Sequence, residues 1–136
     1  MITISTDKSK LQVEVIHQFL TATYWAKGRT IEQVKKTIDH CLCFGVYLDK
    51  KQIGFARIAT DYTVFAYLMD VFILPDFQGN DYSKQLMKAI HEEPKLQSCK
   101  VWMLKTSDAH WLYKQFGYSD LKHPEKVMER LLIGKV

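Results

Sequence analysis

The residues with the clearest potential for chemistry lie where an apolar segment passes into a polar turn. Residues 64–74 are apolar on both faces, with Asp70 as their single charge, which is typical of a central strand. The turn 78–83 follows, and a helical pattern begins at Asp81. Free amides of a helix that starts beside the carboxyl end of a buried strand attract anions, which makes the turn a candidate phosphate site. The alternative is structural: residues 79–80 form a plain turn and Asp81 caps the helix.

Other groups of reactive residue types do not have the spacing of a site. Cys41 and Cys43, with His40 beside them, lack zinc-ligand spacing and fall on one face of an expected strand, as buried thiols do. The segment 107–110 contains Ser, Asp and His, but no nucleophile elbow surrounds the serine. We therefore expect neither a metal site nor a nucleophilic hydrolase.

Composition limits the class of protein. The chain has 136 residues, 47% of them hydrophobic, and a formal net charge of +4, which fits a single folded domain over residues 1–136. The lysines are scattered and form no basic stripe, so nucleic acid is not the expected partner. Three cysteines without an even framework indicate a reducing compartment, and no long apolar run or basic leader is present. We expect a cytoplasmic protein that does not bind membranes.

The elements that position these residues follow from apolar periodicity. Thr30 with Gln33 predicts a capping box at the start of a helix. The succession of strand, helix and strand over 64–105 implies a parallel right-handed crossover. The fold class is α/β (α+β), with a mixed, mostly antiparallel central sheet flanked by helices. The expected strands are 2–5, 42–48, 53–59, 64–74, 101–104 and 127–133, and the expected helices are 11–24, 30–40, 81–93 and 109–116.

Two motifs in this order of elements resemble the GNAT superfamily of acetyl-CoA-dependent N-acetyltransferases. The turn from Gln78 is similar to the family's cofactor loop, Gln/Arg-x-x-Gly-x-Gly/Ala, and the segment 108–118 is similar to its helix motif, Ala-x-x-Leu-Tyr-x-x-x-Gly-Phe. Further segments resemble a bacterial GNAT subgroup of undefined substrate: 24–30, 42–47, 54–57 and 60–73. The resemblance implies the GNAT fold and transfer of an acetyl group to a primary amine by direct attack.

The resemblance also implies which residues bind acetyl-CoA, the expected cosubstrate. The pantetheine arm would pair, like an added strand, with the backbone of Val71, Phe72 and Ile73. The pyrophosphate would be wrapped by the amides of a loop, with Lys84 as a nearby charge. The residues of that loop are Gln78, Gly79, Asn80, Asp81, Tyr82 and Ser83.

The loop departs from the family pattern at two positions. Asp81 stands where the first motif glycine is expected, and Ser83 stands where the second Gly/Ala is expected. Asp81 brings a side chain and a negative charge to the pyrophosphate, or it caps its own helix and occupies amides that the phosphate needs. The alternative to an enzyme is therefore a non-catalytic acyl-CoA or ligand-binding module on the same fold.

The remaining roles concern the acceptor, a small-molecule or peptide amine. By resemblance, Tyr113 would protonate the departing CoA thiolate. Asp70, the lone charge of the expected central strand, could orient the ammonium or relay its proton. Tyr24 and Trp25 precede a glycine turn and are candidates to line the acceptor pocket. Each role has a structural alternative. Tyr113 would be a core residue, Asp70 a buried carboxylate satisfied by a neighbouring loop, and the two aromatics simply packed. The resemblance leaves a homodimer open.

Overall fold

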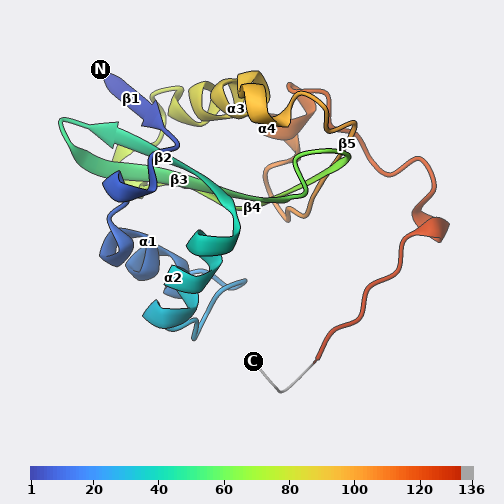
Figure 1. The fold of residues 1–136 in the computed structure, drawn as a ribbon, viewed down its shortest axis with the longest axis horizontal. Helices are drawn as coiled ribbons and strands as arrows, with labels where there is room; N and C mark the ends of the chain where they lie inside the picture. Colours follow the sequence, from blue (N-terminus) through green and yellow to red (C-terminus); the bar gives the residue numbers. More distant parts are fainter. Residues whose placement is uncertain (133–136) are drawn as a thin grey trace. The chain divides into compact units, whose positions relative to one another are not determined.

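The computed structural model describes residues 1–132, and the chain divides into two compact units, residues 1–105 and 106–136 (Figure 1). The first unit contains a five-stranded sheet in the order β1-β2-β3-β4-β5. Neighbouring strands are antiparallel except β4 and β5, which are parallel, so the predicted mixed sheet is confirmed. The strands are β1 (Ile2–Ser5), β2 (Leu42–Leu48), β3 (Lys51–Thr60), β4 (Phe65–Ile73) and β5 (Val101–Leu104).

Helices cover both faces of this sheet. Figure 1 shows α1 (Val13–Thr21) and α2 (Ile31–His40) on one face and α3 (Tyr82–Glu92) on the other. Helix α3 connects the parallel strands β4 and β5 and so supplies the predicted crossover. Short 3-10 turns lie at Lys8–Lys10, Pro75–Phe77 and Pro94–Leu96.

The capping box at the start of α2 is confirmed. The Gln33 amide donates to Thr30 Oγ1 at 3.1 Å, and the Thr30 amide donates to Gln33 Oε1 at 2.8 Å. Helix α1 is shorter than the predicted 11–24. It begins only at Val13, where the preceding Gln12 amide donates to Gln52 Oε1 of β3 at 2.7 Å. At its other end α1 stops at Thr21, and residues 22–30 lead to α2.

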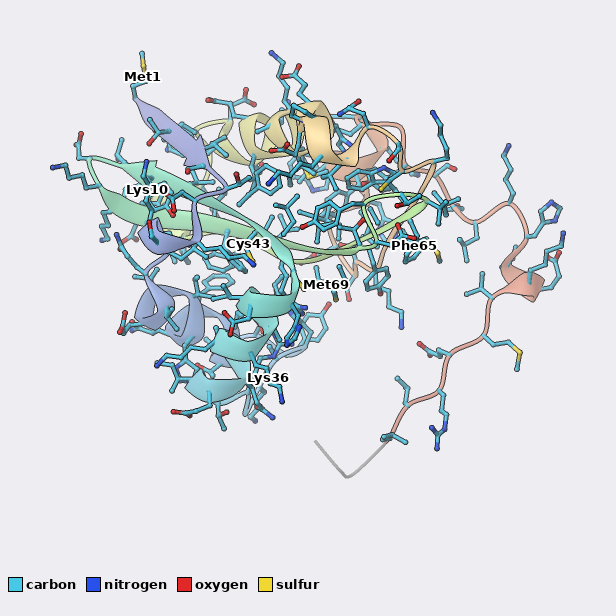
Figure 2. All side chains as sticks on the ribbon, viewed as in Figure 1. Met1, Lys10, Lys36, Cys43, Phe65 and Met69 are labelled. Atoms are coloured by element: carbon cyan, nitrogen blue, oxygen red, sulfur yellow. The ribbon has the colours of Figure 1, made fainter. Side chains whose placement is uncertain are left out.

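The core on the α1–α2 side is built from aromatic and branched side chains. Phe72 of β4 stacks on Phe19 of α1 with ring centroids 4.1 Å apart, and the Phe55 ring of β3 lies 6.0 Å from the Phe72 ring. Cys43, labelled in Figure 2, is buried in the same cluster. Burying each large apolar side chain stabilises the fold by roughly 1.5–3 kcal/mol, so this cluster fixes β4 against the helices. Its other fully buried members include Ile16, Leu20 and Val34.

Strand β4 contains a bulge at Asp70. Residues 69–72 of β4 lie opposite residues 55–57 of β3, so β4 carries one residue more than its partner. Asp70 has a φ of +54°, in the left-handed region that a regular strand never uses. The bulge therefore changes the direction of the strand immediately before Val71.

The second unit contains α4 (His110–Lys114) and a short turn at Pro124–Lys126. Gly117 closes the segment after α4 with a φ of +91°, as predicted for a helix stop. The strand predicted over 127–133 is wrong for residues 127–132, which have no regular structure; Ile133 lies outside the described residues. The apolar side chains of this segment come in adjacent pairs, 127–128 and 131–132, and do not alternate as in a strand with one buried face. All four are exposed, and the segment has no partner strand among residues 1–132.

Candidate functional site

The edge of β4 on its β5 side is open over its second half. β5 pairs only with residues 65–68 of β4, and residues 69–73 have no strand partner on that side within residues 1–132. Backbone amides and carbonyls on such an edge can pair with an extended ligand in the way of an added strand. The residues predicted to contact pantetheine, Val71, Phe72 and Ile73, all lie on this stretch.

The predicted pyrophosphate loop follows β4 after the short 3-10 turn Pro75–Phe77. Gln78 Nε2 donates to the Ile73 carbonyl at 2.9 Å, so the side chain of the first loop residue ties the loop to the strand. Gly79 and Asp81 both have left-handed backbone, with φ of +85° and +67°. A left-handed conformation costs a non-glycine residue about 1–2 kcal/mol, although aspartate tolerates it better than most. Asn80, between them, donates from Nδ2 to the Phe77 carbonyl at 3.2 Å.

Helix α3 begins without a side-chain cap. Asp81 occupies the N-cap position, but its carboxylate makes no capping hydrogen bond, so the alternative in which this side chain caps the helix is wrong. Capping requires an extended backbone at the N-cap residue, and Asp81 is left-handed. The carboxylate instead lies 3.7 Å from Lys84 Nζ. The first-turn amides, including those of Tyr82 and Ser83, are consequently not occupied by this side chain.

Asp70 lies at the centre of a buried cluster. Its Oδ2 accepts hydrogen bonds from Arg29 Nη1 at 2.8 Å and Arg57 Nε at 2.9 Å, and its Oδ1 accepts one from Trp25 Nε1 at 3.0 Å. Burial alone would lower the pKa of the Arg57 guanidinium, but the Asp70 carboxylate raises it above its ordinary value. The geometry favours the interpretation of Asp70 as a carboxylate satisfied by a neighbouring loop over that of a proton relay.

Sequence reasoning missed both arginines of this cluster. The chain contains three arginines, and two of them converge on Asp70. A signal was present, because a carboxylate in an otherwise apolar central strand requires a cationic or hydrogen-bonding partner, and arginine is the usual residue in buried ion pairs.

The two candidate acceptor-site aromatics lie at the surface of the first unit. Tyr24 is 71% and Trp25 45% exposed, and their rings meet edge to face with centroids 5.3 Å apart. The structural alternative of packed core aromatics does not describe them. The indole N–H of Trp25 is turned inward, to Asp70.

Tyr113 lies in α4 of the second unit and is buried there. Its ring meets Tyr118 at 5.9 Å between centroids. Burial, reinforced by the nearby Asp108 carboxylate, raises the pKa of the Tyr113 phenol to about 12. The phenol therefore holds its proton across the neutral and mildly alkaline range.

The cysteines form no reactive centre among the described residues. Cys41, Cys43 and Cys99 are buried and not in disulfides, and burial raises the pKa of Cys43 to about 12. Over residues 1–132, no three histidine, cysteine or acidic side chains are grouped as a metal ion would require. In the same part of the chain, every helix is too short or too polar to cross a membrane.

Residues 39–120 match the family described as Acetyltransferase (GNAT) domain. This chain belongs to the GNAT acetyltransferase family. A crystal structure of a protein from Xanthomonas campestris pv. campestris, assigned to the GNAT family, is 44% identical, with a TM-score of 0.95 over 99% of this chain and 96% of that one. The predicted family and fold class are thereby confirmed, and the protein is an acyltransferase.

Two further proteins are similar at lower identity. A Gibberella zeae protein assigned as an acetyltransferase is 27% identical and the alignment covers 88% of this chain and 80% of that protein. A crystal structure of a Clostridium acetobutylicum acetyltransferase with acetyl-CoA is 16% identical, with a TM-score of 0.67 and 97% of each chain covered. At that identity the likeness concerns the fold alone.

Proposed function

We propose that this GNAT protein transfers an acetyl group from acetyl-CoA to a primary amine by direct attack, without a covalent enzyme intermediate. The observation that carries the proposal is the succession of two features. The open strand edge at residues 69–73 is followed, after the turn at residues 74–80, by an α3 N-terminus whose N-cap side chain makes no capping hydrogen bond. Acetyl-CoA has parts that match both features: its extended pantetheine arm carries amides that can pair with the strand edge, and its pyrophosphate suits the helix N-terminus.

In this proposal, acetyl-CoA binds mainly to backbone. The amides and carbonyls of Val71, Phe72 and Ile73 pair with the pantetheine arm, and the amides of residues 78–83 receive the pyrophosphate at the positive end of the α3 dipole. Lys84 lies close to Asp81 and reduces the repulsion between that carboxylate and the phosphates. The acetyl-CoA seen with the Clostridium acetobutylicum relative supports this choice of cosubstrate.

The transfer step needs a neutral amine and a proton for the leaving group. The amine nitrogen attacks the thioester carbonyl, a C–N bond forms, the C–S bond breaks, and the nitrogen loses its proton to solvent water. Tyr113 donates a proton to the CoA thiolate, a role that fits a phenol whose pKa of about 12 keeps it protonated. Asp70 acts as a positioning residue, because its carboxylate is engaged by three donors.

We propose that residues 1–136 act as one GNAT domain, since the matched span 39–120 includes residues of both compact units. The alternative function, a non-catalytic acyl-CoA or ligand-binding module, is favoured by Asp81 and Ser83 at the motif positions for glycine. The two functions differ in turnover: the module binds acetyl-CoA without acetylating any amine.

The proposal is tested by calorimetric titration with acetyl-CoA and with S-acetylpantetheine, which lacks the pyrophosphate. We expect micromolar binding of acetyl-CoA and at least tenfold weaker binding of the truncated thioester.

Lys84→Gln removes the cation next to Asp81 and is expected to weaken acetyl-CoA binding without changing S-acetylpantetheine binding. Lys88→Gln, one turn further along α3, is the matched control and is expected to change neither. Saturable acetyl-CoA binding with no transfer to a panel of amines would favour the module.

A further inference from the structure

The buried cluster around Asp70 carries more positive than negative charge. One carboxylate faces two guanidinium groups, Arg29 and Arg57, and no second carboxylate pairs with either of them in residues 1–132. The other nitrogens of Arg57 face sulfur: Nη1 lies 3.4 Å from Cys41 Sγ, and Nη2 lies 3.6 Å from Met69 Sδ. Sulfur is a weak hydrogen-bond acceptor. Two guanidinium groups therefore share one carboxylate as their strong acceptor.

Arg29 is the most exposed charged member of this cluster. Its side chain is 21% exposed, and only its Nη1 is used in the described structure, in the bond to Asp70. The backbone of Arg29 is also fixed: its carbonyl accepts from His17 Nε2 at 3.0 Å, and its amide donates to the Ala26 carbonyl at 3.1 Å. The remaining N–H donors of Arg29 are therefore held in a defined position at the surface and available to an anion.

Trp25 places an oriented apolar surface on the same cluster. Its indole N–H donates to Asp70 Oδ1, the oxygen that the arginines leave unused, so the ring cannot turn freely. The ring is nevertheless 45% exposed. An exposed indole fixed by its polar end offers a flat face for an apolar group at little entropic cost.

We propose that Arg29 and Trp25 select an acceptor amine that also carries a carboxylate, such as an amino acid or a peptide with a free carboxylate near its amine. The carboxylate binds the unused donors of Arg29, and the apolar part of the acceptor lies on the Trp25 indole. This inference rests on the proposed function, because Asp70 immediately precedes the residues assigned to the thioester arm. Asp70 serves here as the positioning residue that holds both side chains.

The test compares acceptors that differ only in the anion, at equal concentrations of unprotonated amine. Acetyl transfer is measured with L-phenylalanine and L-phenylalaninamide, and with phosphoethanolamine and ethanolamine. We expect kcat/KM for L-phenylalanine to exceed that for its amide at least tenfold. Arg29→Gln is expected to reduce this ratio to within about twofold, mainly through KM, with acetyl-CoA affinity unchanged. Lys27→Gln removes the same charge from an exposed position of the same segment and is expected to preserve the ratio.

Binding supplies a readout that does not depend on turnover. The indole N–H resonance of Trp25, assigned with a Trp25→Phe variant, is expected to shift with L-phenylalanine and not with its amide, and to lose this response in Arg29→Gln. Equal responses to acid and amide, or equal loss of selectivity in Lys27→Gln, would overturn the inference. If the protein prefers phosphoethanolamine over ethanolamine but does not distinguish L-phenylalanine from its amide, the proposal that Arg29 binds a carboxylate would be overturned. Carboxylate-dependent binding without acetyl transfer would support the inference while contradicting the proposed function.

Discussion

The Asp70 carboxylate accepts a 2.9 Å hydrogen bond from Arg57 Nε, although Arg57 is paired across the sheet with Met69. The bulge in β4 allows this diagonal contact, because the left-handed backbone of Asp70 turns its side chain to the α1–α2 side. A charged pair is thus embedded next to the strand edge that we assign to acetyl-CoA.

Asp70→Asn is expected to destabilise the protein by about 3–5 kcal/mol, because it leaves two guanidinium groups without a counter-charge in a largely buried site. Asparagine tolerates the left-handed backbone, so the change isolates the charge. Urea unfolding measures the effect, with the exposed Asp76→Asn as control. Adding Arg57→Met is expected to restore part of the loss, and a double variant less stable than Asp70→Asn would contradict the charge argument.

Asp81→Gly is expected to strengthen acetyl-CoA binding by about tenfold, or 1.4 kcal/mol. The change removes a negative charge near the pyrophosphate and the cost of a left-handed side chain at a φ of +67°. Calorimetry with acetyl-CoA measures it, and Asp81→Asn separates the charge from the backbone effect. Weaker binding in Asp81→Gly would show that the contact between Asp81 and Lys84 supports the loop.

The features that sequence predicted well are local or strongly periodic. The capping box of Thr30 and Gln33 depends on residues three positions apart. The run that is apolar on both faces correctly predicts an interior strand, β4, although β3 is the central one. The GNAT assignment rested on two motifs in their correct order, and the family match confirmed it.

The features that sequence did not predict depend on distant partners or on backbone conformation. Arg29 and Asp70 are 41 positions apart, and no local pattern joins them. Asp81 has a side chain that often caps helices, but its left-handed backbone turns the carboxylate toward Lys84. The tail at 127–132 is apolar enough for a strand, yet a strand requires a partner, and none pairs with it within the described residues.

Acidification is expected to reduce stability through His91. Burial lowers the pKa of this side chain below its ordinary value of 6.5, and its ring lies 4.5 Å from that of Trp102. The unfolded chain therefore binds a proton more readily than the folded protein, so the free energy of unfolding falls as pH drops from 6.5 toward the folded pKa. His91→Phe is expected to show a smaller decrease between about pH 7.5 and pH 5.5. The exposed His110→Gln is the control and should keep the wild-type slope.

Tyr113→Phe is expected to lower kcat at least tenfold with little change in acetyl-CoA affinity, because it removes only the proton donated to the thiolate. With a pKa of about 12, the phenol stays protonated at the pH of any practical assay, so its ionisation produces no alkaline loss of activity below about pH 10. Tyr118→Phe is the matched control: this residue is half-buried, burial raises the pKa of its phenol, and its ring contacts Tyr113. Steady-state kinetics with a responsive amine measures both variants. Unchanged turnover in Tyr113→Phe, or an equal decrease in Tyr118→Phe, would remove Tyr113 from the proton-transfer step and leave the thiolate to be protonated by solvent.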